Sequence, residues 1–310
     1  MDLVASHLPG GTLDQGDVVF TDSHEPETDV AVIVNYLKYD EKITARRGCI
    51  WKWDNEPIVR RPFARGLDRV FTHAPKNGDR RVVTAPPILD WWVGRSYDEL
   101  AQKRPPRKTK MISAIASAKT MIDGHRRRTE FVDFLSTRLP QLDVFGQGRE
   151  QELADKWDGL APYRYSIAIE NTSKPDYWTE KIADCFVTHT VPLYFGATNI
   201  GEYFPHGSFI WLPIDGPESA LDIIHETLEH DDWSARASAL AEARELVLNR
   251  YSLGAQIMRL VRAERETIVS SPLASVRVHG RRTRPGGWIR GGGLLTNIRH
   301  QLNRRVGRSR

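Results

Sequence analysis

Short apolar runs alternate with helical patterns along most of this 310-residue chain, and this alternation most restricts its fold. Four runs in the first third, each ended by polar or proline residues, predict buried strands. They are Val30–Tyr36, Gly48–Trp53, Arg69–His73 and Arg80–Ile88. Strands that alternate with helices are joined by crossover connections and pair in parallel. The chain is therefore expected to be an α/β protein with parallel sheets.

The pattern stops at a basic, proline-bearing segment, Ala101–Lys110, and then starts again. The second block predicts strands at 111–117, 142–146, 163–169, 191–196 and 208–213, and helices at 125–139, 177–190 and 218–266. Two such blocks indicate two Rossmann-like domains. We place the first domain at residues 1–106 and the second at 107–270, followed by a basic tail at 271–310.

The tail carries the positive charge of the chain. It holds ten Arg and no Lys, Asp or Glu, and without it 34 Lys and Arg stand against 40 Asp and Glu. Apolar residues such as Ile298 and Leu302 make it partly amphipathic. This favours binding of 271–310 to an anionic membrane surface, and a solvated, disordered tail is the alternative. Because the body is acidic, we expect no specific binding of nucleic acid.

The start of the sequence lacks the features of a secretory signal, and no apolar run is long enough to cross a bilayer. The two cysteines, Cys49 and Cys185, are expected to be buried free thiols, as in a reducing compartment. We therefore expect a cytoplasmic protein that is peripheral to the inner face of the membrane if its tail binds lipid.

A polar junction, Glu170–Lys181, lies between a predicted strand and a predicted helix. Ligands of parallel α/β sheets bind at the carboxyl ends of strands, and a helix start offers free N–H groups to a phosphate. Lys181 can reach a diphosphate, and Glu180 can accept hydrogen bonds from ribose or sugar hydroxyls. Asn171 and Tyr177 can donate to phosphate oxygens. The junction therefore predicts a nucleotide-sugar site.

A plainer interpretation is that Asp176 and Thr179 cap the helix and that the charged residues after them are merely solvated. The order of motifs over 163–212 favours a site instead. An aromatic–basic–aromatic start, an apolar strand, Glu-Asn, a Tyr six residues later, Thr-Glu-Lys, a helix, a Val-Pro strand ended by Gly, and Ser-Phe-Ile follow one another. This stretch resembles the C-terminal signature of bacterial-type family 10 glycosyltransferases, the α-1,3/1,4-fucosyltransferases.

The resemblance implies a GT-B fold, in which two Rossmann-like domains enclose the active site in the cleft between them. The domain at 107–270 would hold GDP-fucose, and the domain at 1–106 would bind the acceptor, an oligosaccharide or a lipid-linked glycan. Asn171, Tyr177, Glu180 and Lys181 match family positions that bind the donor, whereas Glu170 is expected to serve structure more than contact. The implied activity is an inverting transfer of fucose to a glycan hydroxyl.

Two other functions remain open at this point. The same scaffold could use another nucleotide-deoxysugar. Alternatively, a degenerate transferase body could carry an Arg-rich tail that binds membrane or nucleic acid. The aromatic segment Asp90–Leu100 adds rings against which a sugar could stack, and packing between domains is its alternative role.

The family also has an arginine that clamps the diphosphate, seven residues before a leucine in a helix of the donor domain. Arg128 has this spacing to Leu135. Its neighbours Arg126 and Arg127 leave the assignment open, and a solvated helix start is the alternative for the whole cluster.

Inverting transfer needs a carboxylate that takes the proton of the acceptor hydroxyl. In the family this base is a Glu at a strand end in the N-terminal domain, which points to Glu56, followed here by Pro57. Asp54 is the alternative, and a simple turn is the plainer interpretation. The sequence Asp54–Glu56 also resembles a metal-binding D-x-D motif. We nevertheless expect no protein-bound catalytic metal, with Mn²⁺ or Mg²⁺ only assisting the diphosphate.

Overall fold

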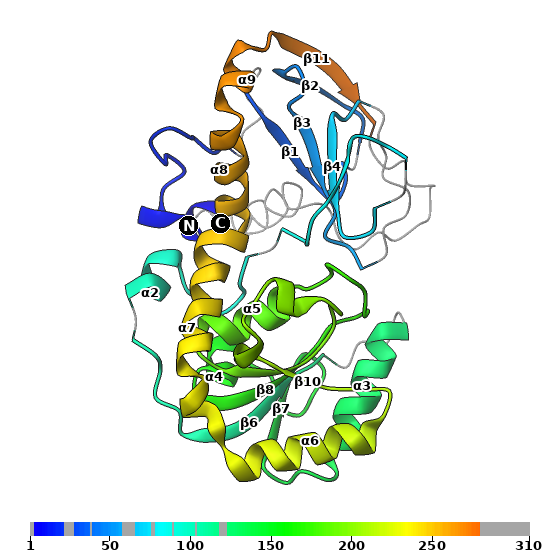
Figure 1. The fold of residues 1–310 in the computed structure, drawn as a ribbon, viewed down its shortest axis with the longest axis vertical. Helices are drawn as coiled ribbons and strands as arrows, with labels where there is room; N and C mark the ends of the chain where they lie inside the picture. Colours follow the sequence, from blue (N-terminus) through cyan, green and yellow to red (C-terminus); the bar gives the residue numbers. More distant parts are fainter. Residues whose placement is uncertain are drawn as a thin grey trace, which may run out of the picture. The chain divides into compact units, whose positions relative to one another are not determined.

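The computed structural model describes residues 3–21, 28–37, 39–57, 66–75, 78–88, 90–102, 104–117 and 123–279. The chain divides into two compact units. Figure 1 colours the chain by residue number, so the residues of each unit can be found with its colour bar. Unit 1 combines Met1–Ile88 with Gln256–Arg310, and unit 2 is Leu89–Ala255. The sequence placed the boundaries at 106/107 and 270/271. The structure instead returns the chain to unit 1 from residue 256.

Unit 1 is built on a four-stranded parallel sheet of order β1-β3-β4-β5. Its strands are β1 Ala31–Val34, β3 Ile50–Trp53, β4 Arg69–Thr72 and β5 Val82–Thr84. All four residues of β3 are buried, as expected for a central strand of an apolar run. Trp53 stacks on Phe71 of the neighbouring strand, with ring centroids 4.3 Å apart.

A second, two-stranded sheet completes unit 1. Strand β2, Glu41–Arg46, pairs antiparallel with β11, Leu273–Val278, across more than 220 residues of sequence. Helices α8, Leu253–Ala263, and α9, Arg265–Ser270, lead into β11. The sequence analysis predicted neither strand. It assigned the start of β11 to the basic tail, whose remaining residues, 280–310, lie outside the described part of the chain.

Unit 2 holds a five-stranded parallel sheet of order β10-β9-β8-β6-β7. Its strands are β6 Lys110–Ile115, β7 Leu142–Phe145, β8 Tyr163–Ile169, β9 Val191–Phe195 and β10 Ile210–Trp211. The α-helices that follow the first strand of this sheet are α3 Asp123–Ser136, α4 Lys156–Leu160, α5 Glu180–Val187, α6 Pro217–His230 and α7 Ala237–Leu246. Two short helices, α1 Leu3–Ser6 and α2 Tyr97–Gln102, precede the sheets of units 1 and 2.

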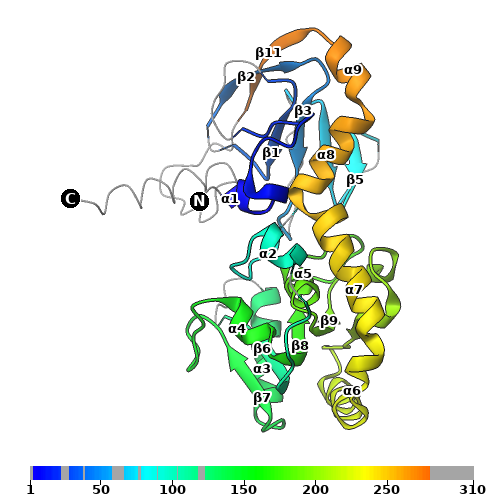
Figure 2. The same ribbon diagram turned by 90° about the vertical axis from the view of Figure 1, so that its left-hand side faces the viewer.

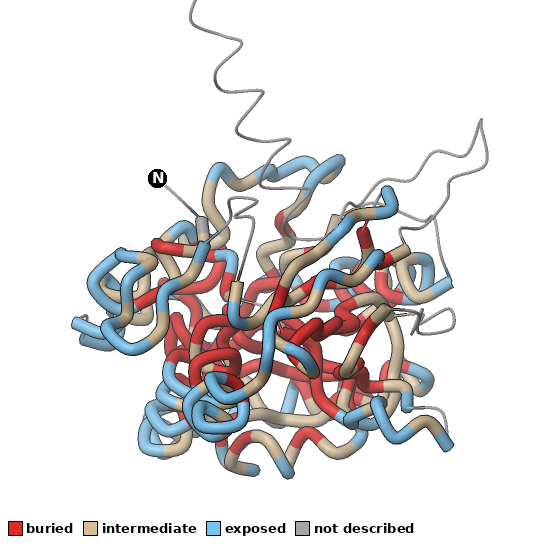
Figure 3. Tube along the Cα trace, turned by 90° about the horizontal axis from the view of Figure 1, so that it is seen from above, coloured by how far each residue is buried: buried red, intermediate tan, exposed pale blue. Residues whose placement is uncertain are grey.

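Helix α5 packs on β8 and β9, and α7 packs in turn against α5 (Figure 2). Buried stretches of the chain lie toward the inside of the trace and exposed ones toward its outside (Figure 3). All residues of β9 and all but one of β8 are buried. The right-handed crossovers of such a sheet bring the carboxyl ends of all its strands to one edge. That edge carries the polar junction described above.

The α/β class and the two units with parallel sheets are confirmed, in agreement with the GT-B architecture. The active site between the domains stays a prediction. Helix α5 is shorter than the predicted 177–190, because it starts only at Glu180 and ends at Val187. No helix within the described residues is both long and apolar enough to span a membrane.

Candidate donor site and candidate base

The polar junction forms where three neighbouring strands of unit 2 end. Glu170 and Asn171 directly follow β8, and Gly196 directly follows β9. Ser117 is the second residue after the end of β6. The backbone N–H of Glu170 donates to the carbonyl of Phe195 at 2.8 Å, which extends the β8–β9 pairing into the site. The junction is therefore part of the sheet edge rather than a free loop.

Glu170 fastens the start of α5 to the end of β8. Its side chain is fully buried and accepts hydrogen bonds from the Thr179 N–H at 2.7 Å and the Thr179 hydroxyl at 2.7 and 2.9 Å. Thr179 is the N-cap of α5. Gly196 allows this approach, because a Cβ there would lie 2.5 Å from the Glu170 Cγ. Glu170 thus has the structural role that the resemblance implied.

The charged pair Glu180 and Lys181 opens the helix. The Lys181 Nζ lies 3.2 Å from the Glu170 carboxylate, 3.3 Å from that of Glu180 and 2.9 Å from the Thr179 hydroxyl. Both side chains keep about a fifth of their surface exposed, 23% for Glu180 and 21% for Lys181. They are held in place by buried neighbours and remain accessible to a ligand.

Electrostatics keep both groups charged. Burial raises the pKa of Glu180, but the amines of Lys181 and Lys156 outweigh it and bring that pKa down to about 2. Burial lowers the pKa of Lys181, yet the carboxylates of Glu170 and Glu180 raise it above its ordinary value. An ionised carboxylate beside a cation suits a ligand with sugar hydroxyls next to phosphates.

Arg128, in the second turn of α3, reaches the same edge. Its guanidinium is buried and donates to the Asn171 Oδ1 at 2.6 Å and to the Ser117 hydroxyl at 3.5 Å. Its Nε has no partner within the described part of the chain. Burial lowers the pKa of Arg128, while the charges of Glu170 and Glu180 act to raise it.

The other two arginines of the cluster differ from Arg128 in burial and contacts. Arg126 is exposed and pairs with Asp123 at 2.9 Å, and Arg127 is exposed and pairs with Asp215. The geometry therefore favours Arg128 as the residue that belongs to the donor site.

The start of α3 lies directly against the junction. A Cβ at Gly124 would come within 1.8 Å of the Asn171 carbonyl oxygen, so only glycine fits here. This close approach brings the first turns of α3 to the strand end and explains how Arg128 can contact Asn171.

The loop between Asn171 and α5 is held by a side-chain clamp. Asp176 adopts a left-handed conformation with φ 62°, and its N–H donates to the Asn199 Oδ1 at 2.8 Å. The Asp176 carboxylate accepts from the Asn199 amide at 2.9 Å and from the Tyr203 hydroxyl at 2.6 Å. The clamp fixes the residue before Tyr177, whose side chain is buried and whose hydroxyl is among the groups that act on the charge of Arg128.

The sequence analysis missed three residues around this site. Ser117 contacts Arg128. Arg149 donates from its Nε to the carbonyl of Ala116 at 3.1 Å and pairs with Asp133 of α3. Lys156 acts on Glu180 from α4. Arg149 lies in the glycine-containing turn after β7, and a basic residue at a strand end could have been noticed in the sequence. No local pattern points to Ser117 or Lys156.

In unit 1, Glu56 and Asp54 follow β3 in different environments. Asp54 is buried, its side chain being 6% exposed, and it pairs with the equally buried Lys52. Glu56 is partly exposed, and its carboxylate makes no hydrogen bond or ion pair with any residue that the structure describes. An acceptor hydroxyl needs access to the base, so these environments favour Glu56 over Asp54.

The turn that carries Glu56 is rigidly held. The side chain of Asn55 donates to the Ile88 carbonyl and accepts from the Ile88 N–H, both at 2.7 Å. The Asn55 N–H donates to the Asn35 Oδ1 at 2.7 Å. The Glu56 carbonyl accepts from the His73 Nε2 at 2.8 Å. The turn interpretation and a role for Glu56 are thus compatible.

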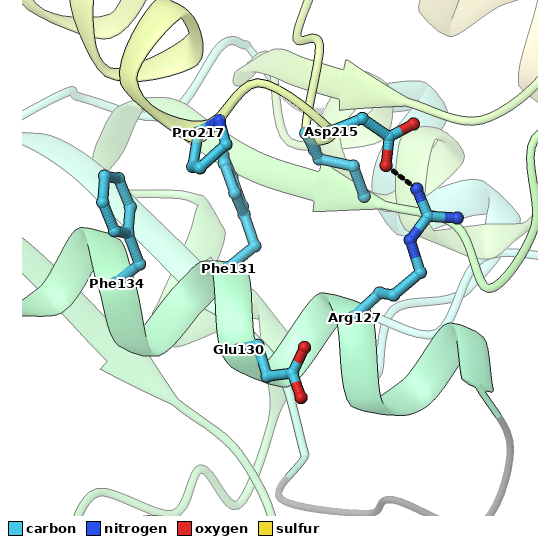
Figure 4. A pocket seen from close by; sticks show the side chains of 7 residues that line it. Arg127, Glu130, Phe131, Phe134, Asp215 and Pro217 are labelled. Carbon is cyan, nitrogen blue, oxygen red and sulfur yellow. Dashed lines mark hydrogen bonds and ion pairs between the residues drawn. The ribbon is translucent and has the colours of Figure 1, made fainter.

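An open cavity of about 260 Å³ lies on unit 2 between α3 and the start of α6 (Figure 4). It is lined by Arg127, Glu130, Phe131, Phe134, Ile214, Asp215 and Pro217. Of the candidates for the donor site, only Arg127, the alternative to Arg128, lines it. Among the described residues, no three His, Cys, Asp or Glu side chains are grouped so that they could hold a metal ion.

Comparison with known proteins points to one family. Residues 105–214 match the family model described as glycosyltransferase family 10 (fucosyltransferase), C-terminal part. An α-(1,3)-fucosyltransferase of Helicobacter pylori is 36% identical over 88 residues, which cover 27% of this chain and 18% of that protein. A 3-galactosyl-N-acetylglucosaminide 4-α-L-fucosyltransferase of Pan troglodytes is 27% identical over 214 residues, 66% of this chain and 54% of that protein.

The chain thus matches less than two thirds of the length of these curated relatives. Among solved structures, the crystal structure of an α1,3-fucosyltransferase with GDP-fucose aligns over 71% of this chain and 78% of its own, with a TM-score of 0.48 and 19% identity. The family match covers β6 to β10, and with them every donor-binding candidate named above.

Proposed function

Residues 105–214 make this chain a member of glycosyltransferase family 10, and from that premise we propose that it transfers fucose from GDP-fucose to a hydroxyl group of a glycan. The observation that carries the proposal is the convergence of three charged groups at one sheet edge. Arg128, Glu180 and Lys181 come from two helices and meet around the buried carboxylate of Glu170.

In this proposal the donor is held by complementary charge. Lys181 and Arg128 bind the two phosphates, and Asn171 and Tyr177 orient them. Glu180 is ionised at neutral pH and accepts hydrogen bonds from hydroxyls of the donor. The backbone N–H groups at the start of α5 add a partial positive charge on the same side.

The transfer step inverts the anomeric carbon. The acceptor oxygen attacks this carbon while its proton passes to the carboxylate of Glu56. The bond between the anomeric carbon and the phosphate oxygen breaks, and its electron pair leaves with GDP. Lys181 and Arg128 stabilise the charge that develops on the leaving diphosphate. A Mn²⁺ or Mg²⁺ ion bound by the diphosphate would help to neutralise this negative charge, but none of the steps above depends on it.

For the acceptor we propose a glycan that contains galactose and N-acetylglucosamine. The support is the similarity to the chimpanzee relative, whose name specifies a 3-galactosyl-N-acetylglucosaminide. A lipid-linked form of such a glycan would fit a protein whose basic C-terminal residues bind an anionic membrane.

Isothermal titration with GDP, GDP-fucose, GDP-mannose, UDP-galactose and UDP-glucose tests the donor site. We expect selective binding of the guanine nucleotides, with affinity lowered in Lys181→Ala and Glu180→Ala. Binding of UDP alone would preserve the reaction class and overturn the donor. A folded protein that binds none of the five would contradict the transferase and favour a degenerate body.

Membrane binding has its own test, cosedimentation with vesicles of anionic or neutral lipid. We expect binding to the anionic vesicles only, weakened by salt. The deletion for this test has to start at residue 280. A deletion from 271 would remove β11 and its pairing with β2. Equal sedimentation of the shortened and complete chains would contradict a role of the C-terminal residues.

A further inference from the structure

One aromatic ring of unit 2 is exposed although its sequence neighbours are buried. Trp91 and Val93 are buried in the core of unit 2, at 1% and 0% exposure, whereas Trp92 between them is 47% exposed. Of the tryptophans that the structure describes, Trp92 alone is exposed to this extent. Single exposed apolar residues are common, so the position of this ring has to decide its role.

The segment around Trp92 is firmly attached to unit 2. The Asp90 carboxylate accepts from the Leu253 N–H at 3.0 Å, and the Trp91 indole donates to the Arg95 carbonyl at 2.7 Å. With both ends held and its two neighbours in the core, the backbone of Trp92 has little freedom. Its ring is presented to solvent by a rigid support.

The same backbone is tied to the helix that opens the donor site. The Trp92 N–H donates to the Asp184 carboxylate of α5 at 2.6 Å. Asp184 is fully buried and is also paired with Lys156 at 2.8 Å. It lies one helical turn after Glu180, and the charge of Lys156 acts on both carboxylates. The backbone of Trp92 is thereby fixed against α5, at a residue one helical turn from Glu180.

The ligand that suits this ring follows from its one-sided exposure. A purine has two apolar faces and binds best when both are covered. A pyranose such as galactose has one face of C–H groups and one face of hydroxyls, so it can stack on an open ring and keep its polar face in water. The side chain of Lys156, 32% exposed, pairs with the same Asp184 carboxylate that accepts from the Trp92 N–H, so its amine offers a donor for a hydroxyl of the ligand.

We propose that Trp92 is the stacking platform for a pyranose ring of the acceptor glycan, held beside the donor by the Asp184–Trp92 hydrogen bond. This inference rests on the proposed function, because it assigns part of the acceptor site of that transferase. The sequence analysis predicted the acceptor site in the domain at residues 1–106, which includes Trp92. In the structure Trp92 belongs to unit 2, so this acceptor contact would lie in unit 2.

The test compares Trp92→Ala, Trp92→Phe and Tyr39→Ala with the parent protein. Tyr39 is another exposed aromatic residue, 66% accessible, and serves as the matched control. Transfer is measured with GDP-fucose and galactosyl-β-1,3-N-acetylglucosamine. Binding of the same disaccharide is measured separately by saturation-transfer NMR, and GDP affinity by titration.

We expect Trp92→Ala to raise the KM for the disaccharide by about tenfold, the effect of losing an aromatic anchor. The phenyl ring of Trp92→Phe should restore most of the binding, while GDP affinity stays within twofold and Tyr39→Ala behaves like the parent. Disaccharide binding by NMR should fall in parallel in Trp92→Ala.

An unchanged disaccharide affinity in Trp92→Ala, or no disaccharide binding by the parent, would overturn the proposal. So would a loss of GDP affinity in place of acceptor affinity, since the ring would then stack on guanine. Failure of the proposed function has a different signature, because the parent would then transfer no fucose even where its disaccharide binding depends on Trp92.

Discussion

The carboxylate of Glu170 accepts hydrogen bonds from both the backbone N–H and the hydroxyl of Thr179. This relationship explains why Glu-Asn at the end of a strand and Thr-Glu-Lys at the start of a helix occur together in one motif. The first carboxylate and the threonine form a connection inside the protein. The connection leaves Glu180 and Lys181 partly exposed on the first turn of α5.

We therefore expect Glu170→Leu to lower the free energy of unfolding by about 3 to 5 kcal/mol, because Lys181 and the start of α5 lose a buried partner. Glu170→Gln should have a smaller effect, since its amide oxygen can still accept from Thr179. Urea unfolding in the absence of nucleotide measures both. The exposed Glu130→Gln on α3 is the control and should change stability by no more than about 0.5 kcal/mol.

Arg128→Gln should weaken GDP binding by about 10- to 100-fold, the size expected for losing a charged hydrogen bond to phosphate. Arg126→Gln removes an identical charge two residues away on the exposed surface of α3 and should leave the affinity within about twofold of the parent. Isothermal titration with GDP gives both values. Equal losses in the two variants would mean that only the overall charge of this helix matters.

Gly124→Ala should destabilise the protein by about 1 to 3 kcal/mol, because its Cβ would overlap the carbonyl oxygen of Asn171. It should also reduce GDP affinity, since the first turns of α3 and Arg128 with them must move away from the strand end. Gly216→Ala is the control, because its nearest neighbours lie 3.8 Å from an added Cβ. Thermal unfolding and GDP titration of both variants check the two effects, and normal GDP binding by Gly124→Ala would contradict the second.

The buried amine of Lys108 predicts a pH dependence of stability. It donates to the carbonyls of Ala161 and Thr188 and to the Thr190 hydroxyl at 2.8 to 2.9 Å, and burial lowers its pKa from 10.5 to about 7. The folded state therefore binds this proton less tightly than the unfolded state does. This group makes the protein more stable as pH rises from about 7 towards 10.5.

The measurement is the difference in unfolding free energy between the parent and Lys108→Met at several pH values from 7 to 10. We expect this difference to grow in favour of the parent by up to about 1.4 kcal/mol per pH unit. Lys110→Met is the control. The hydroxyl of Tyr163 and the carboxylate of Asp143 raise the pKa of Lys110, so its variant should show no slope below pH 10. A flat difference for Lys108→Met would contradict the prediction.

Much of unit 2 was predictable from local pattern alone. Strands β8 and β9 are runs buried on both faces, and they lie close to the predicted bounds. Strands β2 and β11 were not predictable in this way. β11 alternates exposed and partly buried residues, β2 is mostly partly buried, and their pairing joins residues 41–46 to residues 273–278. No local window contains that information.

The site divides in the same manner. Asn171, Glu180 and Lys181 belong to one continuous motif and were predicted from it. The contacts of Arg128 with Asn171 and Ser117 depend on Gly124 allowing α3 to approach the sheet, which the sequence alone does not reveal. The start of α5 was misplaced by three residues, because Thr179 has an extended backbone and caps the helix, which therefore begins only at Glu180.

The discontinuity of unit 1 has a consequence for biosynthesis. Unit 2 is a single continuous segment, Leu89–Ala255, whereas unit 1 needs the residues from Gln256 onward, including β11. On the ribosome, unit 2 can thus complete its sheet while the first 88 residues still wait for their partners. Unit 1, whose synthesis begins first, is therefore the unit that finishes folding last.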